Sequence, residues 1–213
     1  MPLTDPTEDL RLLTDMRGGN SAAFEALYRR HQGPLYRFAL LRCGSADTAA
    51  DIVQEIFLAM LSDTLRFDPA RGALQGFLFG VARNLLLKHD EARNRHVSSN
   101  RTDDDEGPEG LLIDPAPAPM ERLLASQRAE RVRAALQSLA PHYRDVVILY
   151  EMHDFSYVEI AGVCNIDIGT VRSRLSRARA RLASLLQDDA DGAGATLNGM
   201  CDNQPMVQRE ARP

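Results

Sequence analysis

The residues most able to do chemistry form a basic segment near the C-terminal end of the sequence. Between Gly169 and Leu182 the chain has no acidic residue, and its five arginines are Arg172, Arg174, Arg177, Arg179 and Arg181. Guanidinium groups bind phosphates and, as planar forks, read the edges of bases in the DNA major groove. Short side chains between the arginines would let a helix sit deep in that groove. The pattern predicts DNA contacts by Arg172, Ser173, Arg174, Ser176 and Arg177.

A helix is needed to place these arginines on one surface. Its buried stripe is given by apolar residues at helical spacing: Val171, Leu175, Ala178 and Leu182. Before it, Ser156 and Glu159 form the signature of a capping box, which opens a helix through Val163. Asp167 can cap the basic helix, which we expect to run to about Leu186. Two short helices joined by a tight turn, the second one basic, predict a helix-turn-helix. A solvated basic face is the alternative explanation for the arginines alone.

No arrangement of residues predicts catalysis or metal binding. The five histidines are scattered without metal-ligand spacing, and the three cysteines, Cys43, Cys164 and Cys201, are far apart. The sequence has neither a glycine-rich phosphate loop nor a nucleophile elbow. We therefore predict no catalytic residues, no metal and no cofactor. The N-terminus is unlike a signal peptide, and no apolar run approaches the ~18 residues of a membrane span, so a cytoplasmic protein without membrane insertion is expected.

Two helical blocks are predicted, residues 9–97 and 120–187, on either side of a linker, residues 98–119. The linker has four prolines and six acidic residues against a single base, Arg101, which predicts an extended, mobile segment. The tail, residues 188–213, has the same character and is expected to be disordered. No alternating strand pattern of useful length is present. The expected fold is all-α, with two small helical domains. With a net charge of −5, the chain as a whole does not have the positive charge of a nucleic-acid binder, so any DNA contacts would be confined to a locally basic segment.

Within the first block we expect three main helices. Asn20 can cap the first, and the second spans about residues 47–61, with one apolar face. The third spans about residues 74–93, with Leu78, Val81 and Leu85 inward. A turn-rich loop, residues 67–72, precedes it. In the second block, helices over about residues 121–139 and 143–150 come before the helix-turn-helix.

Two sets of motifs resemble one family. The segment NIDIGTVRSRLSRARARL, residues 165–182, resembles the region-4 helix-turn-helix of extracytoplasmic-function sigma factors, whose recognition helix commonly reads G-T-V-[KR]-S-R-L-x-R-A-R. The segment DIVQEIF, residues 51–57, resembles the region-2 pattern D-x-V-Q-E-x-F. Residues 71–84 are similar to the family's R-G-x-(F)-x-x-W-L-x-x-I-A-R-N run, with Phe77 in place of the tryptophan. In the turn, Cys164-Asn165 replaces Leu-Gly, and asparagine tolerates the left-handed conformation.

The resemblance implies a factor that directs core RNA polymerase to promoters and helps to melt them. Region 2, residues 9–97, would dock on the basic coiled coil of the largest polymerase subunit, through Asp51, Gln54 and Glu55. It would also bind the minus-ten promoter element. Phe67 and Asn84 would hold an unstacked base there, and Arg83 and Lys88 would contact nearby phosphates. Region 4, residues 120–187, would read the minus-35 element. Core RNA polymerase, promoter DNA and an anti-sigma factor are the implied partners.

Two other classes of protein explain part of the sequence. A conventional helix-turn-helix regulator, whose N-terminal half senses a ligand or dimerises, accounts for the basic helix but leaves residues 51–57 and 82–84 unexplained. A sigma-like decoy would bind an anti-sigma factor and never DNA, and the intact arginine helix argues against it. An enzyme is the least supported class. Co-purification with core polymerase and run-off transcription would separate these hypotheses.

Overall fold

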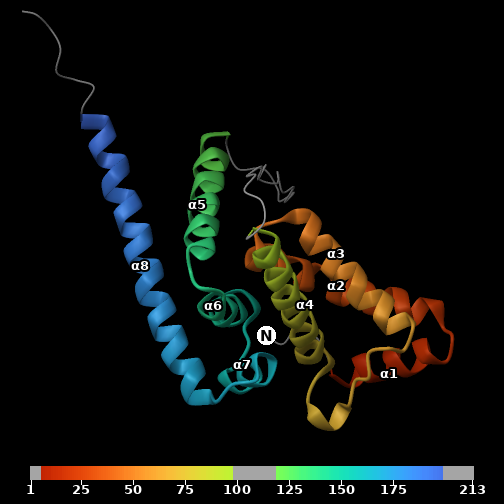
Figure 1. The fold of residues 1–213 in the computed structure, drawn as a ribbon. Helices are drawn as coiled ribbons and strands as arrows, with labels where there is room; N and C mark the ends of the chain where they lie inside the picture. The colour runs from red at the N-terminus through yellow and green to blue at the C-terminus, as the bar shows by residue number, and fades with distance from the viewer. Residues whose placement is uncertain (1–5, 98–118, 199–213) are drawn as a thin grey trace, which may run out of the picture.

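The computed structural model describes residues 6–97 and 119–198, and every regular element in these ranges is helical (Figure 1). The all-α prediction is confirmed for this part of the chain. The first block consists of α1 (Pro6–Arg17), α2 (Ser21–Cys43), α3 (Ala46–Leu61), the short 3-10 helix η1 (Pro69–Arg71) and α4 (Leu74–Val97). The second block consists of α5 (Pro119–Gln137), α6 (Pro141–His153), α7 (Tyr157–Cys164) and α8 (Ile168–Asn198).

Local capping sets where the helices of the first block begin and end. The Asn20 side chain accepts hydrogen bonds from the first free N–H groups of α2, at 3.0 and 3.3 Å. Gly44 ends α2 in the left-handed conformation, with φ 78°, and its N–H bonds to the carbonyl of Leu40. Ser45 then caps α3 by accepting from Thr48 N at 3.3 Å. Two consecutive helices are thus separated by a two-residue turn, which favours packing of α3 on α2.

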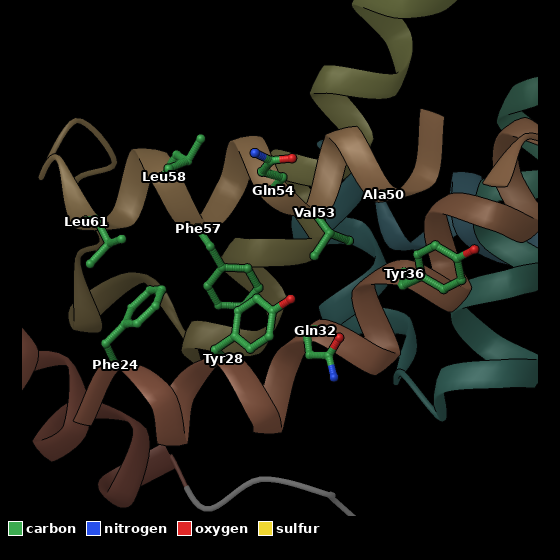
Figure 2. Close-up of a pocket in the computed structure, with 10 residues that line it drawn as sticks. All are labelled: Phe24, Tyr28, Gln32, Tyr36, Ala50, Val53, Gln54, Phe57, Leu58 and Leu61. Atoms are coloured by element: carbon green, nitrogen blue, oxygen red, sulfur yellow. The ribbon is translucent and has the colours of Figure 1, made fainter. Parts of the chain in front are cut away.

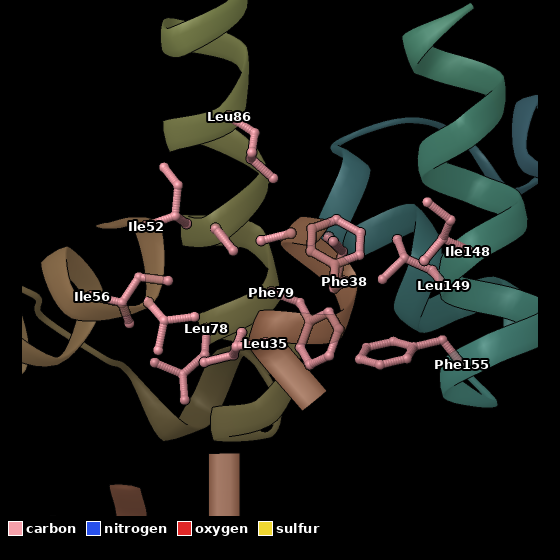
Figure 3. Packing of buried hydrophobic residues seen from close by; sticks show 14 of the residues in the cluster. Leu35, Phe38, Ile52, Ile56, Leu78, Phe79, Leu86, Ile148, Leu149 and Phe155 are labelled. Atoms are coloured by element: carbon pink, nitrogen blue, oxygen red, sulfur yellow. The ribbon is translucent and has the colours of Figure 1, made fainter. Parts of the chain in front are cut away.

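The core of the first block lies among α2, α3 and α4 (Figure 3). Leu35, Ile56 and Leu78 are fully buried, one from each helix. The inward face predicted for α4 is incomplete: Leu78 is fully buried, and Val81 and Leu85 are half-buried against the core, but other buried residues of this helix were not predicted. The fully buried residues of α4 are Leu74, Leu78, Phe79, Ala82 and Leu86. The reason is that α4 is covered on two sides, by α2 and α3 and by α7 of the second block.

The second block contains the predicted helix-turn-helix. Ser156 and Glu159 form both hydrogen bonds of a capping box at the start of α7. Asn165 ends α7 in the left-handed conformation, with φ 53°, as the sequence indicated. The predicted end of the last helix is wrong, since α8 continues through residue 198 instead of stopping near Leu186. Residues 188–198 are therefore helical, not disordered; they contain alanines and no proline. Residues 199–213 lie outside the described residues.

The two blocks pack against each other instead of standing apart. Helix α4 runs beside α7, and α2 contacts both α5 and α6. The Phe79 ring lies 5.3 Å from Phe38 and 5.0 Å from Phe155, so aromatic side chains of both blocks share one core (Figure 3). We call this packing the closed arrangement. The predicted linker, residues 98–119, lies outside the described residues except for Pro119, which begins α5.

Candidate nucleic-acid and polymerase interfaces

Helix α8 presents a basic surface opposite a buried stripe. Val171, Leu175 and Ala178 are at most 1% exposed, whereas Leu182 is half-buried. The predicted DNA contacts Arg172, Ser173, Ser176 and Arg177 are exposed, and Arg174 is half-buried. The structure therefore brings these five residues together on one helix and leaves four of them open to a ligand.

The arginines of α8 differ in their surroundings, which the sequence did not reveal. Arg179 forms an ion pair with Glu151 of α6, with Nη2 and Nε at 2.6 and 2.8 Å from Oε1. Its guanidinium carbon also lies 4.9 Å from the centre of the Tyr150 ring. The hydrogen bond that Arg179 donates to the Glu151 carboxylate raises the pKa of Arg179. Arg179 is therefore engaged with α6, although the basic segment alone gave no reason to separate it from its neighbours.

A second arginine of α8 rests on an aromatic ring. The guanidinium carbon of Arg172 lies 5.9 Å from the centre of the Tyr157 ring, in α7. The Tyr157 and Tyr150 rings are themselves 5.4 Å apart. One flank of α8 is thus held to α6 and α7 by a tyrosine pair, which fixes the direction of α8 relative to these helices.

The predicted polymerase-docking residues lie on one face of α3. Asp51, Gln54 and Glu55 are all exposed, and they line a shallow depression with Leu58. Leu58 is 56% exposed in the middle of this polar face. An apolar side chain surrounded by acids and amides is typical of a protein contact surface.

An apolar groove of about 400 Å³ separates α3 from α2 (Figure 2). The rings of Phe24, Tyr28 and Phe57 form its floor, with Tyr28 and Phe57 centred 4.8 Å apart. Leu58 and Leu61 stand at its edge and are more than half exposed. The sequence predicted the apolar face of α3 but not the groove, because the groove depends on how the two helices are spaced.

Two of the residues predicted for the minus-ten element are accessible on α4. Asn84 and Lys88 are exposed and lie four positions apart, on the same side of the helix. Phe67 is half-buried, and its ring packs against Phe77 with centroids 5.4 Å apart. Phe77 is therefore a packing aromatic, and Phe67 has only part of its ring free.

Arg83 does not point to solvent in the closed arrangement. Its Nε lies 2.8 Å from Oδ2 of Asp145 in α6, and Nε of Arg42 lies 2.5 Å from the other oxygen, Oδ1. Nη2 of Arg42 also bonds to Asp90 at 2.7 Å. Asp145 and Arg42 are each only 1% exposed. The predicted phosphate contact of Arg83 is thus replaced here by a carboxylate from the second block, 62 residues away in sequence.

Arg144, next to Asp145, joins three parts of the fold. Its guanidinium donates to the carbonyl of Arg42 at 2.6 Å and to the carbonyl of Leu139 at 3.0 Å, and also to Gln137. These carbonyls lie at the ends of α2 and α5, where helices lack internal partners. Burial, together with nearby Arg42, lowers the pKa of Arg144. Arg144 therefore holds the end of α5 and the contact with α2.

Among residues 6–97 and 119–198, no three His, Cys, Asp or Glu side chains are grouped to hold a metal ion. Cys43 and Cys164 are free thiols in this part of the chain, and Cys201 lies beyond it. Burial raises the pKa of Cys164 to about 11, which keeps this thiol protonated and unreactive at neutral pH. None of the helices described is long and apolar enough to cross a membrane.

Comparison with known proteins agrees with both motif sets. The family model for sigma-70 region 2 matches residues 27–96, and the model for sigma-70 region 4 matches residues 129–182. The chain is 34% identical over 155 residues to the ECF RNA polymerase sigma factor EcfG of Rhodopseudomonas palustris, which covers 73% of this chain and 80% of that protein. It is 35% identical over 175 residues to the ECF RNA polymerase sigma factor SigL of Mycobacterium tuberculosis, and the match covers 79% of this chain and 91% of SigL.

Two solved structures have similar folds. The sigma factor RpoE of Bartonella quintana, in complex with the anti-sigma factor NepR, superposes with a TM-score of 0.61 at 26% identity over 77% of this chain and 96% of that one. CnrH, in complex with the cytosolic domain of CnrY, superposes with a TM-score of 0.61 at 26% identity, and the match covers 85% of this chain and 99% of CnrH. Together with the helix-turn-helix and the α3 face, these matches show that the chain belongs to the extracytoplasmic-function family of RNA polymerase sigma factors, which recognise promoters to initiate transcription.

Proposed function

We propose that this sigma factor uses three separate surfaces, one each on α3, α4 and α8, to join core RNA polymerase to a promoter. The observation that carries the proposal is that most of the predicted contact residues are exposed even in the closed arrangement. They are Asp51, Gln54 and Glu55 on α3, Asn84 and Lys88 on α4, and Arg172, Ser173, Ser176 and Arg177 on α8. The chain supplies binding and melting, and the polymerase supplies the chemistry of RNA synthesis. We also propose that the protein acts in the cytoplasm, with the polymerase.

The α3 face is the proposed docking surface for the basic coiled coil of the largest polymerase subunit. Asp51 and Glu55 provide two negative charges one helical turn apart, and Gln54 adds hydrogen-bonding capacity. Exposed Leu58 supplies an apolar contact in the centre of the same face. Charge complementarity would orient the partner helices, and burial of Leu58 would add to the affinity.

The minus-35 element is the proposed ligand of α8. At about 100° per residue, Ser173, Ser176 and Arg177 project away from the buried stripe, whereas Arg172 and Arg174 lie on its two flanks. Residues at the centre of a recognition helix face the bases, and those on its flanks face the two phosphate backbones. We therefore assign base contacts to Ser173, Ser176 and Arg177, and phosphate contacts to Arg172 and Arg174.

The minus-ten element is the proposed ligand of α4 and the preceding loop. The exposed amide of Asn84 can donate to and accept from an unstacked base, and Lys88 can reach a phosphate of the same strand. The free part of the Phe67 ring can stack on that base. Arg83 contributes to strand binding only after it leaves Asp145.

An anti-sigma factor is the proposed regulatory partner. In the matched structures RpoE is bound to the anti-sigma factor NepR, and CnrH is bound to the cytosolic domain of CnrY. In this chain, the groove between α2 and α3 suits the apolar side chains of a partner helix. A helix seated in this groove would lie beside Asp51 and Glu55 and would compete with the polymerase.

Reconstitution tests the proposed function directly. Purified chain added to core RNA polymerase should co-purify with it and should support run-off transcription from promoters mapped by sequencing transcripts after overexpression. A helix-turn-helix regulator would bind DNA without joining the polymerase, and a decoy would join neither. Either result would contradict the proposal.

A further inference from the structure

The Asp145 carboxylate is held between two arginines that both belong to the other block. Arg42 of α2 donates to one carboxylate oxygen and Arg83 of α4 donates to the other, at 2.5 and 2.8 Å. The side chains of Asp145 and Arg42 are 1% and 2% exposed, and that of Arg83 is 13% exposed. The two arginines thus form a preformed site for an anion that can accept hydrogen bonds through two oxygens.

A backbone phosphate has the same pair of anionic oxygens as a carboxylate, and arginine binds both groups through the same donors. We propose that Arg42 and Arg83 bind a backbone phosphate of single-stranded promoter DNA, and that Asp145 occupies this site in the closed arrangement. The inference rests on the proposed function, since it extends the DNA surface of α4. It assigns Arg42, which is buried in the closed arrangement, to nucleic-acid binding.

The charges around the site support a change of ligand. In the closed arrangement Arg42 and Arg83 are balanced by Asp145 and Asp90. When Asp145 leaves, Asp90 still orients Arg42, but Arg83 loses its partner. A guanidinium without a counter-ion at a partly apolar surface is costly, so the opened site favours another anion.

The position of the site fits a DNA strand. Arg83 directly precedes Asn84, whose exposed amide is the proposed base contact, and Lys88 follows one turn later. A phosphate held by Arg42 and Arg83 would therefore belong to the same strand as the unstacked base. Closure of the two blocks and binding of this strand exclude each other, because Asp145 and the phosphate need the same donors.

Several neutral contacts also hold the closed arrangement and provide an independent way to open it. Gln137 donates to the carbonyl of Leu41 at 2.9 Å, and the Phe155 ring packs 5.0 Å from Phe79. Phe155 is 5% exposed and carries no charge. Its removal should separate the blocks and leave both arginines and Asp145 unchanged.

The test uses full-length chain and a mixed-sequence single-stranded DNA of about 20 nucleotides, because phosphate contacts do not depend on base sequence. We expect Asp145→Asn to bind this DNA on the order of tenfold more tightly at low salt. The slope of log K against log salt should become steeper by about 0.7, the value for one further phosphate on a single strand. Phe155→Ala should produce a smaller gain in the same direction. Small-angle X-ray scattering should show expansion of both variants.

Matched variants separate the site from a general effect of charge. Asp154→Asn changes the net charge equally, and position 154 is exposed with φ 55°, a conformation that asparagine accepts, so this variant should bind as the wild type does. Adding Arg42→Gln to Asp145→Asn or to Phe155→Ala should remove the gain and the added slope. Circular dichroism confirms that each variant keeps its helices.

Three outcomes would overturn the inference: no gain in either opened variant, an equal gain in Asp154→Asn, or a gain that survives Arg42→Gln. Run-off transcription by the wild-type chain remains a separate result. A chain that transcribes but shows any of these outcomes retains the proposed function and loses only the Arg42–Arg83 phosphate site.

Discussion

At the scale of single residues, the arginines of α8 show that a basic helix does not use all its charges in the same way. Arg179 is paired with Glu151 and stacked on Tyr150, whereas Arg177 is exposed and faces away from the buried stripe. An arginine that is already neutralised by a carboxylate contributes little to phosphate attraction. These two residues therefore form a matched pair for mutation on one helix.

Arg177→Ala is expected to weaken binding of the minus-35 duplex by about 1–3 kcal/mol and to relax base preference at one position, because a guanidinium fork reads a base edge. Arg179→Gln combined with Glu151→Gln should leave base preference and salt slope unchanged, because the pair carries no net charge. Selection from a randomised duplex pool by the holoenzyme measures the base preference and the relative binding of each variant. Loss of preference in the Arg179 and Glu151 double variant would show that Arg179 reads DNA.

His153 is a residue whose environment gives a pH dependence. Burial, with a smaller effect of Arg37 and an opposing effect of Asp154, lowers the pKa of His153 to about 4, and its ring lies 4.8 Å from Phe79. The unfolded histidine titrates near 6.5, so the unfolded chain binds more protons between about pH 6.5 and pH 4. The contribution of neutral His153 to the free energy of unfolding is therefore complete above about pH 6.5 and is lost as the pH falls towards 4.

The expected loss between these pH values is up to about 3 kcal/mol in the free energy of unfolding, at 1.4 kcal/mol per pKa unit. His153→Phe keeps an aromatic ring beside Phe38 and Phe79 and removes the titration. Urea unfolding at pH 7 and pH 4.5 should therefore show a smaller pH effect in this variant than in the wild type. Equal pH effects in the two proteins would mean that His153 is not responsible.

Sequence motifs predicted the exposure of several proposed contact residues better than they predicted the intramolecular partners of the arginines. Asn84, Asp51 and Arg177 are exposed, as their proposed roles require. The partners of Arg83 and Arg179 were not predictable, because each pairs with a residue of another helix, Asp145 or Glu151, that no local spacing connects to it. Pairing across 28 or 62 positions depends on tertiary packing.

At the scale of helices, local signals determined where most elements begin. Asn20, Ser156 and Asn165 perform the capping or turn functions that their residue types suggested. Predictions failed where burial decides the result. The prediction for α4 did not include Phe79 and Ala82 among the buried residues, because the sequence gives no sign that a second block covers them. The extension of α8 was missed because its composition resembles that of the linker.

Helix α3 allows a test of polymerase docking without loss of fold. Asp51→Ala with Glu55→Ala removes two exposed charges and leaves the buried face of α3 intact, so helicity should not change. Affinity for core polymerase should fall by about 2–5 kcal/mol if the two carboxylates meet basic partners. Glu130→Ala, an exposed acid on α5 paired with Arg133, is the control and should bind normally. Unchanged co-purification of the double variant would remove α3 as the docking helix.

At the scale of the whole molecule, the two blocks share one hydrophobic core even though they match two separate family models. The contact combines the aromatic group around Phe79 with the Arg42, Asp145 and Arg83 ion pairs. The sequence predicted two domains joined by a linker and gave no information about a contact between them, because each motif set refers only to its own domain. The closed arrangement therefore has consequences for stability that neither domain has alone.

We expect the described part of the wild-type chain to unfold in one cooperative step, because disruption of either block exposes core residues of the other. Phe155→Ala should cost about 3–5 kcal/mol, the usual range for a buried phenylalanine, and most of this loss should fall on the contact between the blocks. The variant should then unfold in two steps. Hydrogen exchange followed by mass spectrometry assigns each step, since peptides from α2–α4 and from α6–α8 report on different blocks. Leu61→Ala, at the exposed edge of the α2–α3 groove, is the control and should keep a single transition. Two transitions in the wild-type chain, or one shared transition in Phe155→Ala, would show that the blocks are not coupled through this core.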